Sequence, residues 1–243
     1  MIIDVSSDPA AACVRFMASR LAAAQGEDQD ATVAVSGGST APPLFSALAD
    51  AEGLEWERVG VWQVDERVAP DGDDDRNAGQ LDALPARLHP MPVTAGDLED
   101  AAHAYASSLP DAFDVVHLGV GSDGHTASWT PSPHVDADRA LNSPDAVLIV
   151  GEFNGRDRMT LSPGVVNAAR CRVVLVTGEE KAPVIEAWVT GSDRRDAAWL
   201  DAELPVAALD PTDTFLFLDD AAASHLPASR FGDTPRRATF QGR

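Results

Sequence analysis

The feature that most constrains the fold is a recurring kind of segment: a short, continuous apolar run rich in β-branched residues. Such runs are typical of strands buried on both faces, as in parallel sheets. They occupy residues 32–36, 59–64, 114–120, 146–150, 172–176 and 214–218. Helical patterns lie between several of them, over residues 42–51, 96–109 and 179–190, and another helix opens at Asp8-Pro9 and ends at Gly26. This alternation predicts an α/β fold with a mostly parallel sheet that helices cover on both faces.

The chain has no segment between these runs that is long enough to separate two domains, so we expect one domain over residues 1–243. Residues 70–77 contain Gly72 and three consecutive aspartates, which predicts a solvated loop. From about residue 224 onward the chain carries Pro, Gly and four arginines without periodicity. We expect this tail to be loosely ordered.

The charge balance narrows the class of partner. The chain has 39 Asp and Glu against 18 Lys and Arg, a formal net charge of −21. Phosphodiester backbones and anionic lipid surfaces require a basic face, so we expect neither a nucleic-acid nor a membrane partner. The N-terminus shows no signal-peptide pattern and no apolar run approaches the length of a membrane span, which predicts a cytoplasmic protein.

Polar segments follow four of the predicted strands directly. They are Ser36-Gly-Gly-Ser-Thr40, Asp65-Glu-Arg67, Gly121-Ser-Asp-Gly-His-Thr126 and Thr177-Gly-Glu-Glu-Lys181. In open α/β sheets ligands bind outside the carboxyl ends of the strands. We therefore expect the four segments to share one crevice.

The segment 36–40 precedes a helix whose first turn contains Pro42 and Pro43. Its glycines allow a tight turn in which free N–H groups and the hydroxyls of Ser39 and Thr40 form an anion cradle. An ordinary glycine turn in which Ser or Thr caps the helix explains the pattern equally well. The Gly-Lys-Ser/Thr of a nucleotide-binding P-loop is absent.

The spacing Gly119-x-Gly121-x-x-Gly124 formally matches the dinucleotide fingerprint. That fingerprint needs a long helix after the third glycine, whereas Pro131 and Pro133 interrupt the chain here. Nucleotide binding is therefore disfavoured and we expect no cofactor. His125 lies at the same strand end, where a histidine suits a general base. The histidines and the two cysteines show no metal-ligand spacing, so we expect no metal.

Five segments, in this order, resemble the motif set of the 6-phosphogluconolactonases. They are Ser36-Gly-Gly-Ser-Thr40, Asp65-Glu-Arg67, Leu118-Gly-Val-Gly-Ser-Asp-Gly-His-Thr-Ala-Ser128, Arg158-Met-Thr-Leu-Ser162 and Gly178-Glu-Glu-Lys181. The resemblance implies a modified Rossmann-like three-layer sandwich, shared with glucosamine-6-phosphate deaminases. It also implies hydrolysis of 6-phosphogluconolactone in the pentose phosphate pathway. Trp129-Thr130 and Met159 depart from the family's common residues, which concerns the lining of the pocket.

The same resemblance implies roles for single residues. His125 would activate water, with Asp65 and Arg67 as the other catalytic residues, and Arg67 and glycine-loop N–H groups would hold the oxyanion. The residues expected to bind substrate and its phosphate are Gly37, Gly38, Ser39, Thr40, Gly124, Arg158 and Lys181. Asp65 would orient the site or contact sugar hydroxyls, unless its carboxylate only binds backbone N–H groups at the strand end.

Three other functions remain open. The nearest is an amino-sugar phosphate deaminase or isomerase on the same fold, although that group usually carries Gly-His-Ile-Ala-Phe-Asn-Glu where this chain has Gly124-His-Thr-Ala-Ser128. The second is a non-catalytic sugar-phosphate sensor domain, and the third is a nicotinamide-dependent oxidoreductase. We expect a monomer or a small homo-oligomer.

Overall fold

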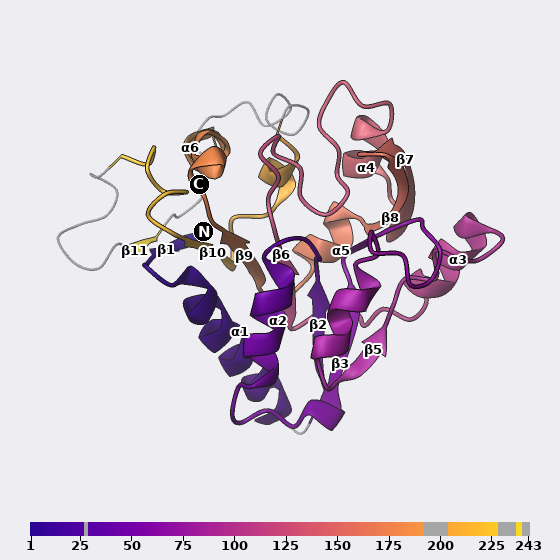
Figure 1. Cartoon of the computed structure of the whole chain (residues 1–243), viewed down its shortest axis with the longest axis horizontal. Coiled ribbons are helices and arrows are strands. Elements are labelled where there is room, and N and C mark those ends of the chain that lie inside the picture. The colour runs from indigo at the N-terminus through magenta and orange to yellow at the C-terminus, as the bar shows by residue number, and fades with distance from the viewer. Residues whose placement is uncertain (27–28, 192–203, 228–236, 240–243) are drawn as a thin grey trace.

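The central sheet of the computed structural model, which describes residues 1–26, 29–191, 204–227 and 237–239, has eight strands (Figure 1). Their order across the sheet is β11 (Arg237–Thr239), β1 (Ile2–Val5), β10 (Thr214–Leu218), β9 (Arg172–Val176), β6 (Val115–Leu118), β2 (Ala31–Val35), β3 (Val59–Gln63) and β5 (Arg87–His89). Every neighbouring pair is parallel except β1 and β11. The predicted mostly parallel sheet is confirmed.

Helices cover both faces of this sheet. On one face lie α1 (Pro9–Gly26) and α2 (Ala41–Ala49), and on the other lie α3 (Leu98–Ala106), α5 (Pro163–Asn167) and α6 (Ala182–Gly191). Successive residues of β6 show why the strands are continuously apolar: Val115 packs in the first core, between the sheet and α1 and α2, and Val116 packs in the second core, between the sheet and α3, α5 and α6. Because successive side chains point to opposite faces, both faces must be apolar. The three-layer α/β sandwich is therefore confirmed.

A second, smaller sheet packs at the edge of the second core. It contains β4 (Asp65–Arg67), β8 (Arg156–Leu161) and β7 (Val147–Phe153), all antiparallel, in that order. We expected residues 146–150 to be a strand of the parallel sheet; the strand forms, but it belongs to this second sheet. The reason is the Asn154-Gly155 turn, in which both residues have positive φ (53° and 81°) and join β7 to β8 as a hairpin.

The remaining helical elements are short. They are α4 (Ala137–Asn142) and the 3-10 turns η1 (Trp56–Arg58), η2 (Ala78–Ala83), η3 (Glu179–Lys181) and η4 (Pro205–Ala208). The helix predicted over 179–190 thus begins as the 3-10 turn η3 and continues as α6. The strands β1, β4, β5, β8 and β11 were not predicted.

The acidic loop 70–77 is exposed over most of its length, as predicted, but not at its end. Its last two residues, Arg76 and Asn77, are buried, because the Arg76 guanidinium pairs with the buried Glu66 carboxylate at 3.0 Å. In the predicted tail, residues 237–239 form β11 against β1. Residues 228–236 and 240–243 of that tail lie outside the described residues. Over the described ranges, no helix has both the length and the apolar character that crossing a membrane requires.

Candidate active site

A cavity of about 360 Å³ opens at the carboxyl ends of four adjacent strands, β9, β6, β2 and β3. All four polar segments that follow these strands contribute to its lining, which confirms the single shared crevice. The cavity lies above the neighbouring strands β2 and β6. From β2 the chain continues to β3 on one side of this pair, whereas the next strand of the sheet after β6, which is β9, lies on the other side. Such a reversal of strand order opens a crevice that helices do not fill.

The turn after β2 forms the floor of the cavity. Gly37, Gly38, Ser39 and Thr40 all line it, and Gly38 has a φ of 114°, which favours glycine. Thr40 is the N-cap residue of α2, yet its side chain makes no capping hydrogen bond. Within the described part of the chain, the hydroxyls of Ser39 and Thr40 have no hydrogen-bond partner. They are therefore available to a ligand, which favours the anion cradle over the capped turn.

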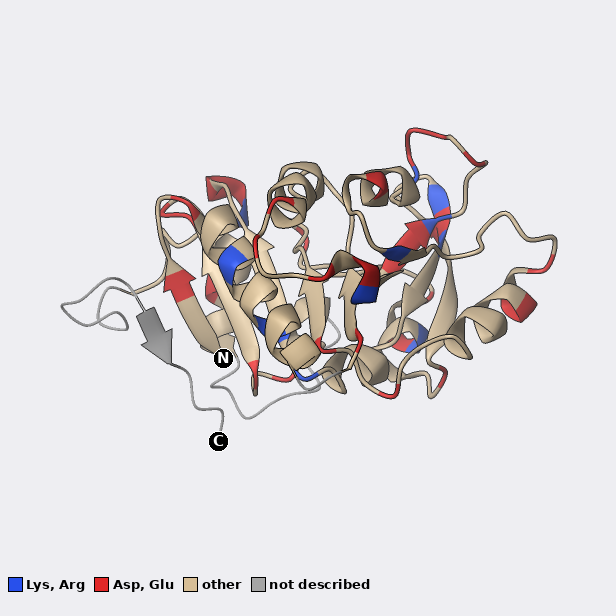
Figure 2. Cartoon of the chain, turned by 90° about the horizontal axis from the view of Figure 1, so that it is seen from below, with Lys and Arg blue, Asp and Glu red and all other residues tan. Residues whose placement is uncertain are grey.

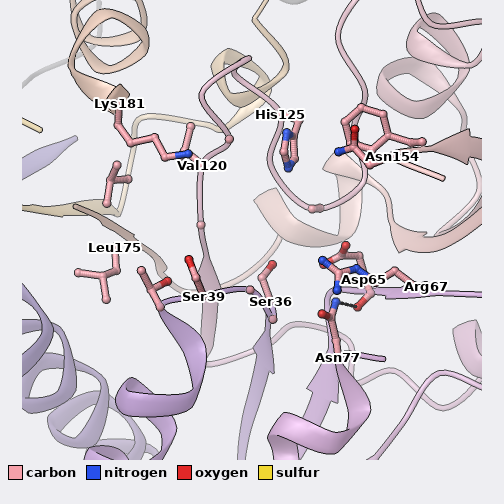
Figure 3. A pocket seen from close by; sticks show the side chains of 18 of the residues that line it. Ser36, Ser39, Asp65, Arg67, Asn77, Val120, His125, Asn154, Leu175 and Lys181 are labelled. Atoms are coloured by element: carbon pink, nitrogen blue, oxygen red, sulfur yellow. Dashed lines mark hydrogen bonds between the residues drawn. The ribbon is translucent and has the colours of Figure 1, made fainter. Parts of the chain in front are cut away.

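Lys181 extends into the cavity from the end of η3, and no described residue forms an ion pair with it. Figure 3 shows Lys181 and Ser39 on one side of His125, with Asp65 and Arg67 on the other side. The side of Lys181 thus combines an ammonium group, two free hydroxyls and the N-terminus of a nine-residue helix. These groups all stabilise a bound anion.

The turn after β6 holds His125 in one orientation. The His125 Nδ1 atom lies 2.5 Å from Asp123 Oδ1, and the backbone N–H of His125 donates to the same oxygen at 3.2 Å. The turn is closed by the Gly121 N–H, which donates to the His125 carbonyl at 2.8 Å. Because a carboxylate only accepts, Nδ1 carries the proton and Nε2 is left as the basic nitrogen.

Asp123 was not among the predicted site residues, although its position two residues before His125 was the available signal. Burial alone would raise the pKa of Asp123, but the hydrogen bonds and charge of His125 outweigh it and hold the pKa below its usual value. The carboxylate is therefore ionised at neutral pH. An ionised carboxylate in contact with an imidazole stabilises the protonated ring.

Two glycines of this turn have different roles. A Cβ at Gly121 would overlap with the His125 ring and the Asp123 carboxylate, so only glycine leaves room for this pair. Gly124 was expected to contact substrate, but it does not line the cavity. Its φ is 85°, and a Cβ there would meet the Leu204 side chain. Gly124 thus serves the backbone turn that presents His125.

Asp65 is buried at the opposite end of the cavity. Its Oδ2 accepts a hydrogen bond from the Ser128 hydroxyl at 2.9 Å, so its partner is a side chain and not the backbone N–H groups considered above. Burial raises the pKa of Asp65, and the Ser128 hydrogen bond and the Arg158 charge offset this rise only in part. The carboxyl group therefore binds a proton more readily than an exposed aspartate does.

Arg67 and Arg158 line the same end of the cavity, facing each other as Cα partners in β4 and β8. Arg67 Nη1 donates to the Asp75 carbonyl at 2.7 Å, and Arg158 donates from Nε and Nη2 to the Phe153 carbonyl at 3.1 and 2.8 Å. Burial lowers the pKa of Arg158, with the Asp65 carboxylate opposing that effect. We expected Arg158 to share an anion with Lys181; both line this cavity, and the strand pairing places Arg158 beside Arg67.

Two further polar residues of the lining were not among the residues expected to bind substrate, although Ser36 belongs to the predicted segment 36–40. Ser36 Oγ and Asn77 Oδ1 are buried and have no hydrogen-bond partner among the described residues, while Asn77 Nδ2 donates to the Asp65 carbonyl at 3.1 Å. Buried polar atoms are rarely left without a partner, which makes these two oxygens unusual. The buried Glu66 accepts the Asn77 N–H at 2.8 Å and fixes its position.

The residues that depart from the family's common pattern do not reach the cavity. Trp129, Thr130 and Met159 are all buried elsewhere, and the Trp129 indole N–H donates to the Leu161 carbonyl at 2.8 Å. The described residues contain no cluster of three or more His, Cys, Asp and Glu side chains able to hold a metal ion. Cys13 and Cys171 are buried, which raises the pKa of their thiols to about 12 and about 11. Such thiols are poor nucleophiles.

The charge of the cavity differs from that of the surface. Figure 2 shows acidic residues spread over the loops and helix ends, with few basic residues among them. The cavity, in contrast, is lined by the cations Arg67, Arg158 and Lys181 against the two acidic residues Asp65 and Glu180. The chain thus places three cations around the cavity at the ends of β9, β6, β2 and β3.

Comparison with known proteins agrees with this geometry. The model of the glucosamine-6-phosphate isomerases/6-phosphogluconolactonase family matches residues 5–217. A 6-phosphogluconolactonase of Synechocystis sp. is 37% identical over 180 residues, covering 67% of this chain and 72% of its own length. One from Streptomyces coelicolor is 33% identical over 254 aligned positions, covering 91% of each chain. The crystal structure of a 6-phosphogluconolactonase from Shewanella baltica superposes with a TM-score of 0.77 at 25% identity, covering 89% of this chain and 97% of the other. The chain therefore belongs to the glucosamine-6-phosphate isomerase/6-phosphogluconolactonase family.

Proposed function

We propose that this chain hydrolyses 6-phospho-D-glucono-1,5-lactone to 6-phospho-D-gluconate, a step of the oxidative pentose phosphate pathway. The relatives at 33 to 37% identity are named 6-phosphogluconolactonases. The observation that carries the proposal is the arrangement within one cavity: an imidazole held by a carboxylate lies between an anion cradle and a pair of arginines. This arrangement suits a phosphorylated ester.

The anion cradle binds the 6-phosphate. The hydroxyls of Ser39 and Thr40, the Lys181 ammonium and the N-terminus of α2 converge on that side of the cavity (Figure 3). Binding of the phosphate there fixes one end of the substrate, so the lactone ring extends toward His125. Holding a reactant in the productive geometry removes much of the entropic barrier of the reaction.

His125 Nε2 is the general base. It takes a proton from a water molecule whose oxygen attacks the lactone carbonyl carbon C1, which forms a tetrahedral oxyanion. When that intermediate collapses, the bond from C1 to the ring oxygen breaks, and the protonated His125 returns its proton to the departing oxygen. Asp123 is a positioning residue, because its contact with Nδ1 sets the tautomer and stabilises the imidazolium.

The arginine pair stabilises the oxyanion. Among the glycine-loop N–H groups that we expected to share this role, those of Gly121 and Gly124 are bound within the turn itself, to the His125 and Gly121 carbonyls. Arg67 and Arg158 each retain N–H groups beyond those bound to the Asp75 and Phe153 carbonyls. Fixed donors that face the developing charge are the largest single source of catalysis in acyl transfer.

The test is a coupled assay in which glucose-6-phosphate dehydrogenase generates the lactone and the formation of 6-phosphogluconate is followed with and without this protein. We expect acceleration well above the spontaneous hydrolysis of the lactone. The rival deaminase function is tested by ammonia release from glucosamine 6-phosphate, and we expect none. No acceleration of lactone hydrolysis, or ammonia release in its place, would contradict the proposal.

The cytoplasmic location, the absence of nucleic-acid and membrane partners, and a monomeric or small homo-oligomeric state remain predictions from the sequence. The oligomeric state is measured directly by analytical ultracentrifugation of the full chain. A large assembly would contradict that prediction without affecting the proposed reaction.

A further inference from the structure

The hairpin turn between β7 and β8 contributes a side chain to the cavity that the reaction above does not use. Phe153 and Asn154 both line the cavity, beside His125 and Arg158. Asn154 has a φ of 53°, in the left-handed region that asparagine tolerates better than most residues. The turn therefore requires Asn, Asp or Gly at this position, and of these Asn is the one that brings an uncharged donor and acceptor.

The turn is anchored from both sides. The Phe153 carbonyl accepts from two nitrogens of Arg158, and the Phe153 ring packs edge-on against the His125 ring with centroids 5.1 Å apart. After the turn, Arg156 pairs with Asp73 at 3.2 Å and with Asp75 at 2.9 Å. The acidic loop thus holds the turn in place, so Asn154 is presented to the cavity from a fixed backbone.

The Asn154 carboxamide has no hydrogen-bond partner in the described part of the chain. Figure 3 shows it near His125, on the side of that ring away from Lys181. A carboxamide both donates and accepts, and it carries no charge. These properties suit a sugar hydroxyl better than a phosphate or an oxyanion.

The direction of the substrate indicates which hydroxyl this is. With the 6-phosphate at Lys181 and the carbonyl carbon C1 at His125, the chain of atoms from C6 through C5 and the ring oxygen to C1 spans the first half of the cavity. The next atom beyond C1 is C2, which lies toward Asn154. We propose that Asn154 is a specificity-determining residue whose carboxamide binds the C2 hydroxyl of the lactone, an inference that rests on the proposed function.

The experiment compares two substrates, 6-phosphogluconolactone and its 2-deoxy analogue, each prepared from the corresponding sugar phosphate. The variant is Asn154→Gly, because glycine accepts the left-handed backbone and removes only the side chain. Asp213→Gly is the matched control, since Asp213 also has a φ of 53° but lies outside the cavity lining. The Tm and the inhibition constant of inorganic phosphate are measured for each protein, and neither is expected to change.

We expect Asn154→Gly to lower kcat/KM for 6-phosphogluconolactone by about five- to tenfold, the effect of losing one hydrogen bond. The same substitution leaves kcat/KM for the 2-deoxy lactone unchanged, and the control variant changes neither. If the wild type is active but Asn154→Gly lowers kcat/KM equally for both lactones, or for neither, the assignment of Asn154 is wrong and the proposed function stands. A wild type that accelerates neither lactone would overturn the proposed function and this assignment with it.

Discussion

The turn after β2 and the turn after β6 are both rich in glycine and both end a buried parallel strand, yet the chain uses them in opposite ways. The first turn, residues 36–40, leaves the hydroxyls of Ser39 and Thr40 without a described partner. The second, residues 119–125, closes on itself through the Gly121 N–H and the contact between Asp123 and His125. An open turn supplies several weak contacts to an anion, whereas a closed turn fixes one side chain for chemistry.

The difference follows from what each glycine permits. Gly38 allows a positive φ in open space, which exposes the turn, whereas Gly121 makes room for the paired side chains of Asp123 and His125. Substitutions in the two turns should therefore change different kinetic constants. Substitutions in the closed turn should lower kcat, and substitutions on the side of the open turn should raise KM.

The largest effect is expected from His125→Ala. Removal of the general base should lower kcat by about 10² or more, measured as lactone hydrolysis above the spontaneous rate. His225→Ala is the control, because His225 pairs with Glu186 at 3.4 Å and does not line the cavity. A His125→Ala variant with near wild-type kcat would remove His125 from the reaction.

Gly121→Ala should also lower kcat, by about 10- to 100-fold, because the new methyl group displaces the His125 ring from its carboxylate. KM should change little, since the phosphate binds at the other turn. Gly96→Ala is a suitable control, because a Cβ at Gly96 would meet nothing within 4 Å. If Gly121→Ala raised KM and left kcat intact, the proposed division between the two turns would be wrong.

Lys181→Ala tests the anion-binding side of the cavity, where Lys181 lies near the open turn 36–40. We expect KM to rise about tenfold and the inhibition constant of inorganic phosphate to rise in parallel, because a charge-assisted contact is lost. Arg15→Ala removes one positive charge from the exposed surface of α1 and should change neither quantity. An unchanged KM in Lys181→Ala would place the phosphate elsewhere, with the arginine pair as the alternative.

Thr40→Val separates the anion cradle from the capped turn. Because the Thr40 hydroxyl does not cap α2, its removal should raise KM about fivefold and leave Tm unchanged. A capping hydroxyl would behave in the opposite way, with a loss of about 1 kcal/mol in the free energy of unfolding. Thr190→Val, whose hydroxyl donates to the Glu186 carbonyl within α6, controls for the substitution itself.

Asp65→Asn has the smallest expected effect, a change in Tm, and Asp65 belongs to neither turn. Because burial raises the pKa of Asp65, ionisation of this carboxyl destabilises the folded state at neutral pH. The variant should raise Tm at pH 7 by about 2–4 °C, the shift expected from roughly 1 kcal/mol in a domain of this size. The gain should shrink as the pH falls through the raised pKa toward the ordinary value, since wild-type Asp65 is then protonated as well. A lower Tm at pH 7 would contradict this.

The spacing of apolar residues located most strands of the central sheet and the longer helices that cover it, because a strand buried on both faces is continuously apolar and a covering helix is apolar on one face. The runs at 172–176 and 214–218 became β9 and β10 without change, and the helix opened by Asp8-Pro9 became α1. The prediction for the run at 146–150 placed it in the wrong sheet, because the residues of an apolar strand do not specify which strand pairs with it. The Asn154-Gly155 turn was the local signal for the hairpin.

The sequence predicted those site residues that lie in polar segments directly after an apolar strand. His125, Lys181 and the segment 36–40 all line the cavity as expected. Gly124 does not, because a glycine motif alone does not distinguish a ligand contact from a backbone turn. Asn77 and Asn154 went unnoticed, since isolated polar residues in loops acquire meaning only when the fold places them against a shared cavity.

The sequence by itself determined the layered α/β architecture, the four polar strand ends and the positive charge among them, because burial, turn chemistry and charge are properties of local segments. Only the tertiary structure decided which distant groups lie together: Ser128 with Asp65, and Arg158 with Arg67. The physical reason is that these pairings depend on strand order and register. Those are set by packing across the whole chain and not by neighbours in sequence.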